Sequence, residues 1–259
     1  MNIFKQFIKS IYSPKDIAAY RSQKNGKTIL YLLLLSLLVS IPTLYYLSKG
    51  MSDGVQSLSN AMEDEAFSFS ISNNELQSNE KEPMIINKDD LTIIVDSTGT
   101  YNTSSISSSG TTVAFLKNEF VFSTAGQSQA MEYANFGDVN ITNNDILDFL
   151  QTTESMLPII ISVFAVIYFI VTMISKVILT LILAIFGNLF SKILGRSLSY
   201  SQVWKITAYS ITLPSVFFII MDTLQTIVPN GSLLNWFISL FIVFLAIKEI
   251  PLDKKPKAL

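Results

Sequence analysis

Two long apolar stretches constrain this chain more than any other feature of its sequence. Residues 28–48 carry no charged side chain, and residues 156–250 are strongly apolar with few charges. A helix needs about 20 apolar residues to cross the hydrocarbon core of a bilayer, and lipid offers no partners to an unpaired backbone. The sequence therefore predicts an α-helical transmembrane bundle, with the polar segment 49–155 folded outside the lipid.

The charges are distributed unevenly around these stretches. Six basic residues and one acid precede residue 28, whereas residues 49–155 contain sixteen acids and four lysines, and the end of the chain is basic again. Basic loops next to membrane helices stay in the cytoplasm. This pattern predicts that both termini are cytoplasmic and that residues 49–155 form an extracytoplasmic domain.

The segment 1–27 is expected to be cytoplasmic, basic and amphipathic. Lys5 and Lys9 lie on one face of a helix over residues 2–12, and the opposite face carries Ile3, Phe4, Phe7, Ile8, Ile11 and Tyr12. Such a helix suits the inner headgroup region, where lysines meet anionic lipid; the alternative is packing on the protein's own cytoplasmic face. Ser13 is expected to cap a second helix.

The first spanning helix is expected over residues 28–48, with a kink at Pro42. No small-x-small cleavage pattern precedes Lys49, which favours an uncleaved anchor over a signal peptide.

Strand signals dominate the polar segment 49–155, which is expected to be a small, mainly β domain. A short amphipathic helix containing Val55, Leu58 and Met62 precedes them. Strands are expected at 67–71, 91–95, 112–116, 119–123 and 131–136, with a turn at 96–99, a hairpin turn at Lys117-Asn118 and a loop at 104–109. Residues 142–145 are expected to cap a helix at 146–151 that leads into the membrane.

Two interpretations compete for the second apolar stretch. One has two helices, 157–175 and 177–194, with a turn at Ser175-Lys176; the other has one long helix, 156–195, that extends into the cytoplasm. No Gly or Pro lies between Pro158 and Gly187 to make a turn, and the hairpin would place several basic residues outside. Both arguments favour the long helix.

The remaining chain is expected to form a cytoplasmic basic connection at 196–205 and spanning helices at 206–228 and 233–250. A turn at 229–232 joins these helices, and a basic tail at 251–259 follows. The total is four spans, or five if the hairpin forms.

The sequence contains no Cys and no His. Zinc sites built on these residues, Ser-His-Asp triads and cysteine nucleophiles are therefore excluded. A dyad of Ser175 and Lys176 is poor chemistry, because adjacent helical side chains point about 100° apart. The acids at Asp89-Asp90 and 143–148 lack a calcium-loop spacing, and a solvated face is favoured there. We expect no enzyme, metal, cofactor or nucleic-acid partner.

Two ionisable residues within apolar segments are candidate functional residues. Asp222 lies within the third span, and Lys176 lies within the second apolar stretch. A charge in this setting marks a transport or proton path by default, although a hydrogen bond between helices, a hydrated edge or a snorkelling lysine is favoured here. Candidate contacts for lipid or a partner protein are Lys5, Lys9, Arg196, Tyr200, Trp204 and Lys205.

The whole chain resembles the bacterial membrane-protein family called domain of unknown function 1189. The resemblance rests on three segments: Phe4-x-x-Phe7-x-x-Ser10-x-Tyr12-x-Pro14, then Glu82-Pro83-x-Ile85-Ile86 with Ile93-Ile94-Val95-Asp96-x-Thr98-Gly99, and Leu198-Ser199-Tyr200-x-Gln202 with Ala208-Tyr209-Ser210-x-Thr212-x-Pro214. The last segment is also weakly similar to the Yip family of membrane proteins. Some members of the first family carry a maltodextrin-utilisation label, which implies a bacterial plasma membrane and a link to carbohydrate uptake.

Three functions are weighed on these grounds. The leading expectation is a non-enzymatic accessory, scaffold or sensor protein that contacts membrane lipids and a membrane-protein partner. The runner-up is a small transporter or channel using Asp222 and Lys176, which would need polar residues along a path or assembly with further copies of the chain. An intramembrane enzyme comes third, because the chain lacks His and Cys.

Overall fold

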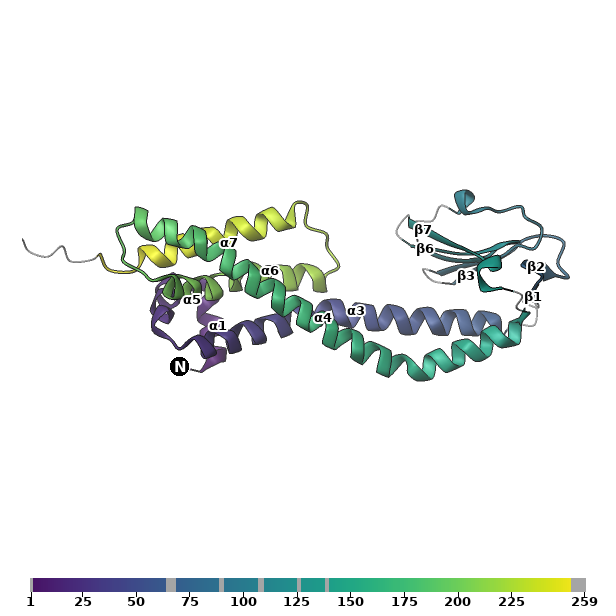
Figure 1. Cartoon of the computed structure of the whole chain (residues 1–259), viewed down its shortest axis with the longest axis horizontal. Helices are drawn as coiled ribbons and strands as arrows, with labels where there is room; N and C mark the ends of the chain where they lie inside the picture. Colours follow the sequence, from purple (N-terminus) through teal and green to yellow (C-terminus); the bar gives the residue numbers. More distant parts are fainter. Residues whose placement is uncertain are drawn as a thin grey trace, which may run out of the picture. The chain divides into compact units, whose positions relative to one another are not determined.

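The computed structural model describes residues 2–63, 69–88, 91–106, 110–124, 127–137 and 140–252. They form two compact units: residues 1–47 with 162–259, called the helical unit, and residues 48–161, called the β unit. Two long helices, α3 (Asn25–Met62) and α4 (Asn143–Ile193), continue from one unit into the other (Figure 1).

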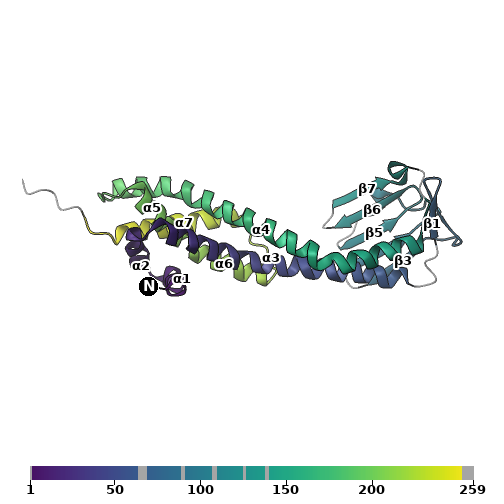
Figure 2. The ribbon, with the colours of Figure 1, turned by 60° about the horizontal axis from the view of Figure 1, so that its bottom comes forward.

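The helical unit contains the ends of α3 and α4 together with shorter helices. These are α1 (Ile3–Tyr12), α2 (Pro14–Ala19), the 3-10 helix η1 (Tyr20–Ser22), α5 (Tyr200–Ser210), α6 (Thr212–Thr223) and α7 (Gly231–Lys248) (Figure 2). Ser13 caps α2 as expected, because its hydroxyl accepts the N–H of Asp16 at 3.3 Å.

Within the described residues, four helical segments are long and apolar enough to cross a membrane. They are Asn25–Asn60, Asn143–Ile193, Tyr200–Thr223 and Gly231–Lys248. The second of these belongs to one continuous helix of 51 residues, so no hairpin turn interrupts it at Ser175-Lys176. The helix passes through Pro158 and then meets neither Gly nor Pro until Gly187.

The helices differ from the expected bounds at several points. α3 does not end at residue 48 but continues through Gly50 and Gly54 to Met62, and it absorbs the amphipathic helix expected there. Two observations account for this extension. No proline follows Pro42 to interrupt α3, and Met62 at its end packs in the core of the β unit. α4 likewise begins at Asn143, so the expected short helix at 146–151 is its first part.

Another difference concerns the connection expected at 196–205, because α5 already begins at Tyr200. Ser199 and Gln202 form a capping box: the Ser199 hydroxyl accepts the N–H of Gln202, and the Gln202 side chain accepts the N–H of Ser199. The expected span 206–228 is divided at Ile211 into α5 and α6, and α6 ends at Thr223 rather than at residue 228. Pro214 lacks the N–H that would bond the carbonyl of Ser210, which accounts for the break.

The β unit contains two sheets. A three-stranded sheet has the order β2-β1-β8, and a five-stranded sheet has the order β3-β4-β5-β6-β7. Only the β4–β5 pair is parallel; the other described pairs are antiparallel. The strands are β1 (Phe69–Ser72), β2 (Glu75–Ser78), β3 (Met84–Lys88), β4 (Leu91–Val95), β5 (Thr111–Phe115), β6 (Glu119–Thr124), β7 (Gln127–Glu132) and β8 (Ile141–Thr142).

Most strand predictions are confirmed. β4 has the predicted bounds, and Phe115 pairs with Phe120 across the predicted hairpin turn. The strand predicted at 131–136 is wrong beyond Glu132, because a 3-10 helix, η4 (Tyr133–Phe136), follows β7 there. Its Tyr133 side chain turns inward, and the Tyr133 hydroxyl donates to the carbonyl of Leu116 at 2.9 Å. Phe67, Asp89-Asp90, residues 107–109 and the tail from 253 lie outside the described residues.

Candidate functional site

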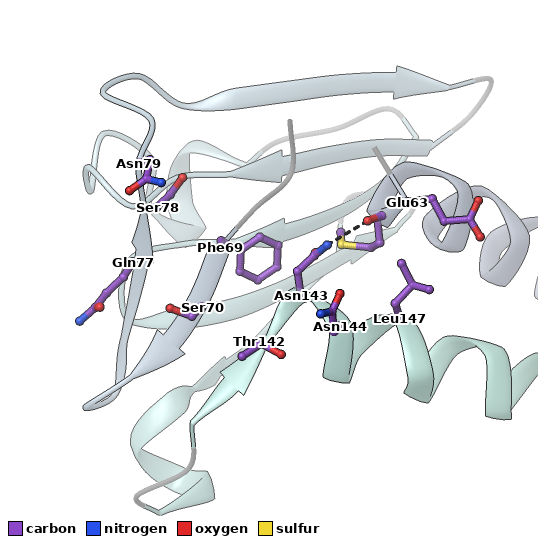
Figure 3. A pocket seen from close by; sticks show the side chains of 11 residues that line it. Glu63, Phe69, Ser70, Gln77, Ser78, Asn79, Thr142, Asn143, Asn144 and Leu147 are labelled. Atoms are coloured by element: carbon purple, nitrogen blue, oxygen red, sulfur yellow. Dashed lines mark hydrogen bonds between the residues drawn. The ribbon is translucent and has the colours of Figure 1, made fainter. Parts of the chain in front are cut away.

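The β unit contains a groove of about 910 Å³ between its smaller sheet and the adjoining ends of α3 and α4 (Figure 3). Amide and hydroxyl side chains dominate its lining, with one aromatic ring. The lining residues are Met62, Glu63, Phe69, Ser70, Gln77, Ser78, Asn79, Thr142, Asn143, Asn144 and Leu147. The groove thus collects residues from β1, β2, β8 and both long helices.

Local hydrogen bonds hold the groove together. The N–H and hydroxyl of Thr142 both donate to the carboxylate of Asp145, and the Asp145 N–H donates to the Thr142 hydroxyl at 3.3 Å, which caps α4 as predicted. The Asn143 amide donates to the carbonyl of Met62 at 2.9 Å and so ties the start of α4 to the end of α3 (Figure 3). Phe69 packs against Phe115, with ring centroids 5.1 Å apart.

The chemistry of the groove suits an uncharged polar ligand. Among the described lining residues, Glu63 is the only ionisable one, and the amides and hydroxyls offer both donors and acceptors. The side-chain oxygen of Asn143 is buried and has no hydrogen-bond partner in the described structure. A ligand hydroxyl or N–H would satisfy such an acceptor. The sequence analysis did not find this site, because its residues come from segments far apart in the chain.

Among the described residues, no group of three or more Asp, Glu, His or Cys side chains lies close enough to hold an ion. In the acidic segment 143–148, Asp145 serves as a helix cap. The hydrogen bonds from Thr142 lower the pKa of that carboxyl below its ordinary value.

The structure places Lys176 inside the helical unit. Its ammonium donates to the hydroxyl of Ser215 on α6 at 3.0 Å. Lys176 also lies well before the end of α4 at Ile193, so it does not sit where the helix ends. The serine that Lys176 reaches is Ser215 rather than its neighbour Ser175. Ser215 is almost completely buried, whereas Lys176 is part-exposed.

Asp222 lies near the end of α6 and is exposed. It lines a second hollow, of about 630 Å³, with Thr43 and Tyr46 of α3 and the α6–α7 connection. Asp222 and Lys176 form no ion pair; within the described residues the one ion pair joins Lys9 and Asp16 at 2.5 Å. The two candidate residues therefore share the helical unit but do not contact each other.

The six candidate lipid-contact residues have different surroundings. Lys5 is exposed, whereas Lys9 bonds Asp16 and, with Ser13, lowers the pKa of the Asp16 carboxyl. Lys205 is buried and donates to the carbonyl of Gln23 at 2.7 Å, so its ammonium is not available to lipid.

The other three candidates donate hydrogen bonds to α4 or α7. Arg196 donates to the carbonyl of Lys248 at the C-terminal end of α7, at 3.3 Å. Tyr200 donates to the carbonyl of Leu181, and the indole of Trp204 donates to the hydroxyl of Thr180. Tyr200 keeps an exposed face, as an interfacial ring requires.

A family model described as "Protein of unknown function (DUF1189)" matches residues 4–247. The chain belongs to this family. No curated protein and no solved structure matches the chain. The family assignment therefore covers both units and assigns a function to neither.

Proposed function

We propose that this member of the DUF1189 family is a non-enzymatic accessory protein of the bacterial plasma membrane. The four apolar helices cross the bilayer with both termini in the cytoplasm, and the β unit lies outside. In this arrangement the β unit senses or binds a molecule, and the helical unit contacts a membrane-protein partner. The observation that carries the proposal is the groove, because it gathers binding chemistry on the β unit.

The ligand class that fits this groove is a neutral carbohydrate. Protein sites for sugars use amide and hydroxyl groups that both donate and accept, and Gln77, Asn79 and Asn144 supply such groups. The volume of the groove is within the range of small-molecule sites, about 300–1,000 Å³. A linear α-glucan would agree with the carbohydrate-uptake link that the family resemblance suggests.

Binding of maltoheptaose to the purified full chain tests this ligand class. Saturation-transfer NMR should show magnetisation passing from the protein to the sugar. The double variant Gln77→Ala/Asn144→Ala should abolish the transfer. The matched variant Gln127→Ala/Gln129→Ala removes two exposed amides from β7 and should leave it unchanged. Absence of transfer in the wild-type chain, or equal transfer in both variants, would remove the carbohydrate assignment.

The partner is tested separately. A tagged full chain should be crosslinked in native membranes and isolated, and co-isolated membrane proteins should be identified. A transport system enriched over a tagged control protein would support the accessory role. Recovery of the chain alone would contradict it, whatever the sugar experiment shows.

A small transporter or channel is the second candidate, and one observation favours it. The described structure places the Lys176 ammonium beside Ser215, and the buried hydroxyls of Ser36 and Ser40 lie on α3 of the same unit. The Ser36 hydroxyl has no hydrogen-bond partner in the described structure. Buried polar groups of this kind line ion or proton paths in membrane proteins.

A further inference from the structure

The N-terminal helix α1 buries two polar side chains and exposes part of its apolar face, while Ile3 and Phe7 pack against the helical core. Gln6 is 2% exposed and Ser10 is 1% exposed. Phe4, Ile8 and Tyr12 follow one another at intervals of about one helical turn. Their side chains are 61%, 57% and 68% exposed. A helix on a water-facing surface has the opposite arrangement. The three exposed side chains form what we call the α1 stripe.

Gln6 and Ser10 are buried where α1 meets polar groups of the bundle. The hydroxyl of Tyr209 on α5 donates to the side-chain oxygen of Gln6 at 3.3 Å. Tyr209 in turn packs between Tyr20 and Tyr31, with ring centroids 4.6 and 4.1 Å away. The Ser10 hydroxyl is satisfied within α1 by the carbonyl of Gln6 at 2.8 Å. Rotating the α1 stripe inward would bury apolar side chains against these polar groups and expose Gln6.

The neighbours of α1 set the surroundings of the stripe. α1 packs against α5 and α6, and the sequence of these helices has no charged residue from Ile206 to Met221. On α3 the nearby first turns expose Ile29 and Leu30. The helix that carries the stripe therefore packs against an apolar segment that is long enough to cross a membrane. Its polar borders are basic: Lys5 is exposed, and Lys9 is next to it on the helix.

We propose that α1 is an in-plane membrane helix whose stripe is immersed in the acyl chains of the inner leaflet, with Lys5 directed to anionic headgroups. The occupant of the exposed apolar face is thus lipid, rather than water, a second copy of the chain or a partner protein. Aromatic and aliphatic side chains with flanking lysines have the composition of such interfacial helices. α1 then contacts lipid on one face. On the other face it contacts Tyr209, which packs against the rings of Tyr20 and Tyr31.

Spin labels on the full chain test this assignment directly. The chain has no cysteine, so a single Ile8→Cys or Tyr12→Cys substitution gives one labelled site. The protein is placed in nanodiscs of phosphatidylcholine and phosphatidylglycerol, and collision of the label with oxygen and with a water-soluble nickel chelate is measured. Ile170→Cys on the exposed face of α4 serves as the lipid control, and Gln129→Cys on β7 serves as the water control.

The proposal expects both α1 labels to behave like Ile170, with high oxygen and low nickel accessibility. High nickel accessibility, as at Gln129, would show that the stripe faces water and would overturn the proposal. Low accessibility to both reagents would show that protein covers the stripe, which also overturns it. Adding Phe4→Asp to the Tyr12→Cys chain should shift the label towards nickel accessibility. No shift would contradict immersion even if the first measurement agreed with it.

Anionic headgroups are tested with the same labels. Replacing phosphatidylglycerol by phosphatidylcholine should raise nickel accessibility at Ile8, because Lys5 loses its partner. The variant Lys5→Gln should lose this dependence on lipid charge. A dependence that persists in Lys5→Gln would remove the role assigned to Lys5.

Discussion

Gly187 of α4 lies against α5 and α7. A Cβ at this position would be 2.6 Å from Val203 Cγ1 and 3.1 Å from Val243 Cγ1. Because valine is stiff about χ1 in a helix, neither methyl group can rotate away. We expect Gly187→Ala to destabilise the helical unit by about 1–3 kcal/mol, the usual cost of overpacking. Thermal unfolding of the full chain in detergent measures this loss.

Gly54→Ala is the matched control. Gly54 is also inside a helix, α3, but no atom lies within 4 Å of its added Cβ. Alanine there should stabilise the helix by about 0.5–1 kcal/mol, since glycine loses more backbone entropy. Equal effects of the two substitutions on thermal unfolding would mean that the close approach of the two valines to Gly187 does not destabilise the alanine variant.

Asp96 organises the turn after β4. Its carboxylate accepts the N–H groups of Thr98, Gly99 and Tyr101 at 2.9, 3.1 and 2.6 Å. Burial alone would raise the pKa of Asp96, but these bonds and that of the Thr98 hydroxyl outweigh it and lower the pKa below 3.8. The carboxylate therefore stabilises the β unit above pH 3.8, and this contribution is lost as the pH falls through the lower folded-state pKa.

We expect Asp96→Asn to remove this part of the pH dependence. Near pH 7 the variant should be less stable by at least about 2 kcal/mol, because the amide satisfies the three N–H groups less well. The difference from the wild-type chain should shrink below pH 4. Melting of the β-sheet circular dichroism signal at several pH values measures both effects. A constant difference across that range would show that ionisation of Asp96 contributes nothing.

Asp222 distinguishes the two proposed functions. Asp222→Asn keeps the shape and hydrogen-bonding capacity of the side chain but cannot carry charge. If the protein is an accessory protein, the variant should restore the phenotype of a strain lacking the chain, because Asp222 is exposed and makes no ion pair in the described structure. Loss of function at normal membrane abundance would instead favour transport. Growth or uptake, compared at matched protein levels, decides between them.

At the scale of elements, the β1–β2 hairpin depends on its two-residue loop. Asn73 and Asn74 have φ of 51° and 62°, and Ser72 pairs with Glu75 on either side of them. Two positive φ values are the mark of a type I′ turn, which favours glycine at its second position. We expect Asn74→Gly to stabilise the hairpin and Asn74→Val to destabilise it by about 1–2 kcal/mol. Hydrogen exchange of β1 and β2 amides should slow in the first variant and accelerate in the second.

Short-range signals predicted much of the structure. The caps at Ser13 and Thr142, the strand at 91–95 and the single helix α4 each depend on neighbouring residues. Two local signals were not recognised, the Asn73-Asn74 turn and the Ser199–Gln202 capping box. The parallel pairing of β4 with β5 and the groove depend on distant segments, which periodicity does not relate. The burial of Gln6 on α1 likewise depends on Tyr209, which is far away in the sequence.

At the scale of the whole molecule, the described structure joins a unit with transmembrane character to a β unit through two helices. Almost none of the apolar part of α4 is buried within the described structure. In water such an apolar surface would cause aggregation. Lipid can cover it, because the backbone N–H and C=O groups of the helix are already hydrogen-bonded to each other. In the proposed arrangement, the charge asymmetry predicts that both termini face the cytoplasm and that the β unit does not.

Single cysteines test this topology without removing any native thiol, because the chain has none. Gln129 in the β unit and Ser232 at the start of α7 should react with an impermeant thiol reagent in intact cells. Lys24 and Ser197 should react only after the cells are permeabilised.

These four positions are exposed, so lack of labelling reports the side of the membrane rather than burial. Ser10 on the inward face of α1 is buried, so it would remain unlabelled on either side and is unsuitable. Labelling of Ser197 in intact cells would contradict the four-span arrangement. Labelling of Lys24 with protection of Gln129 would reverse the orientation of the whole chain.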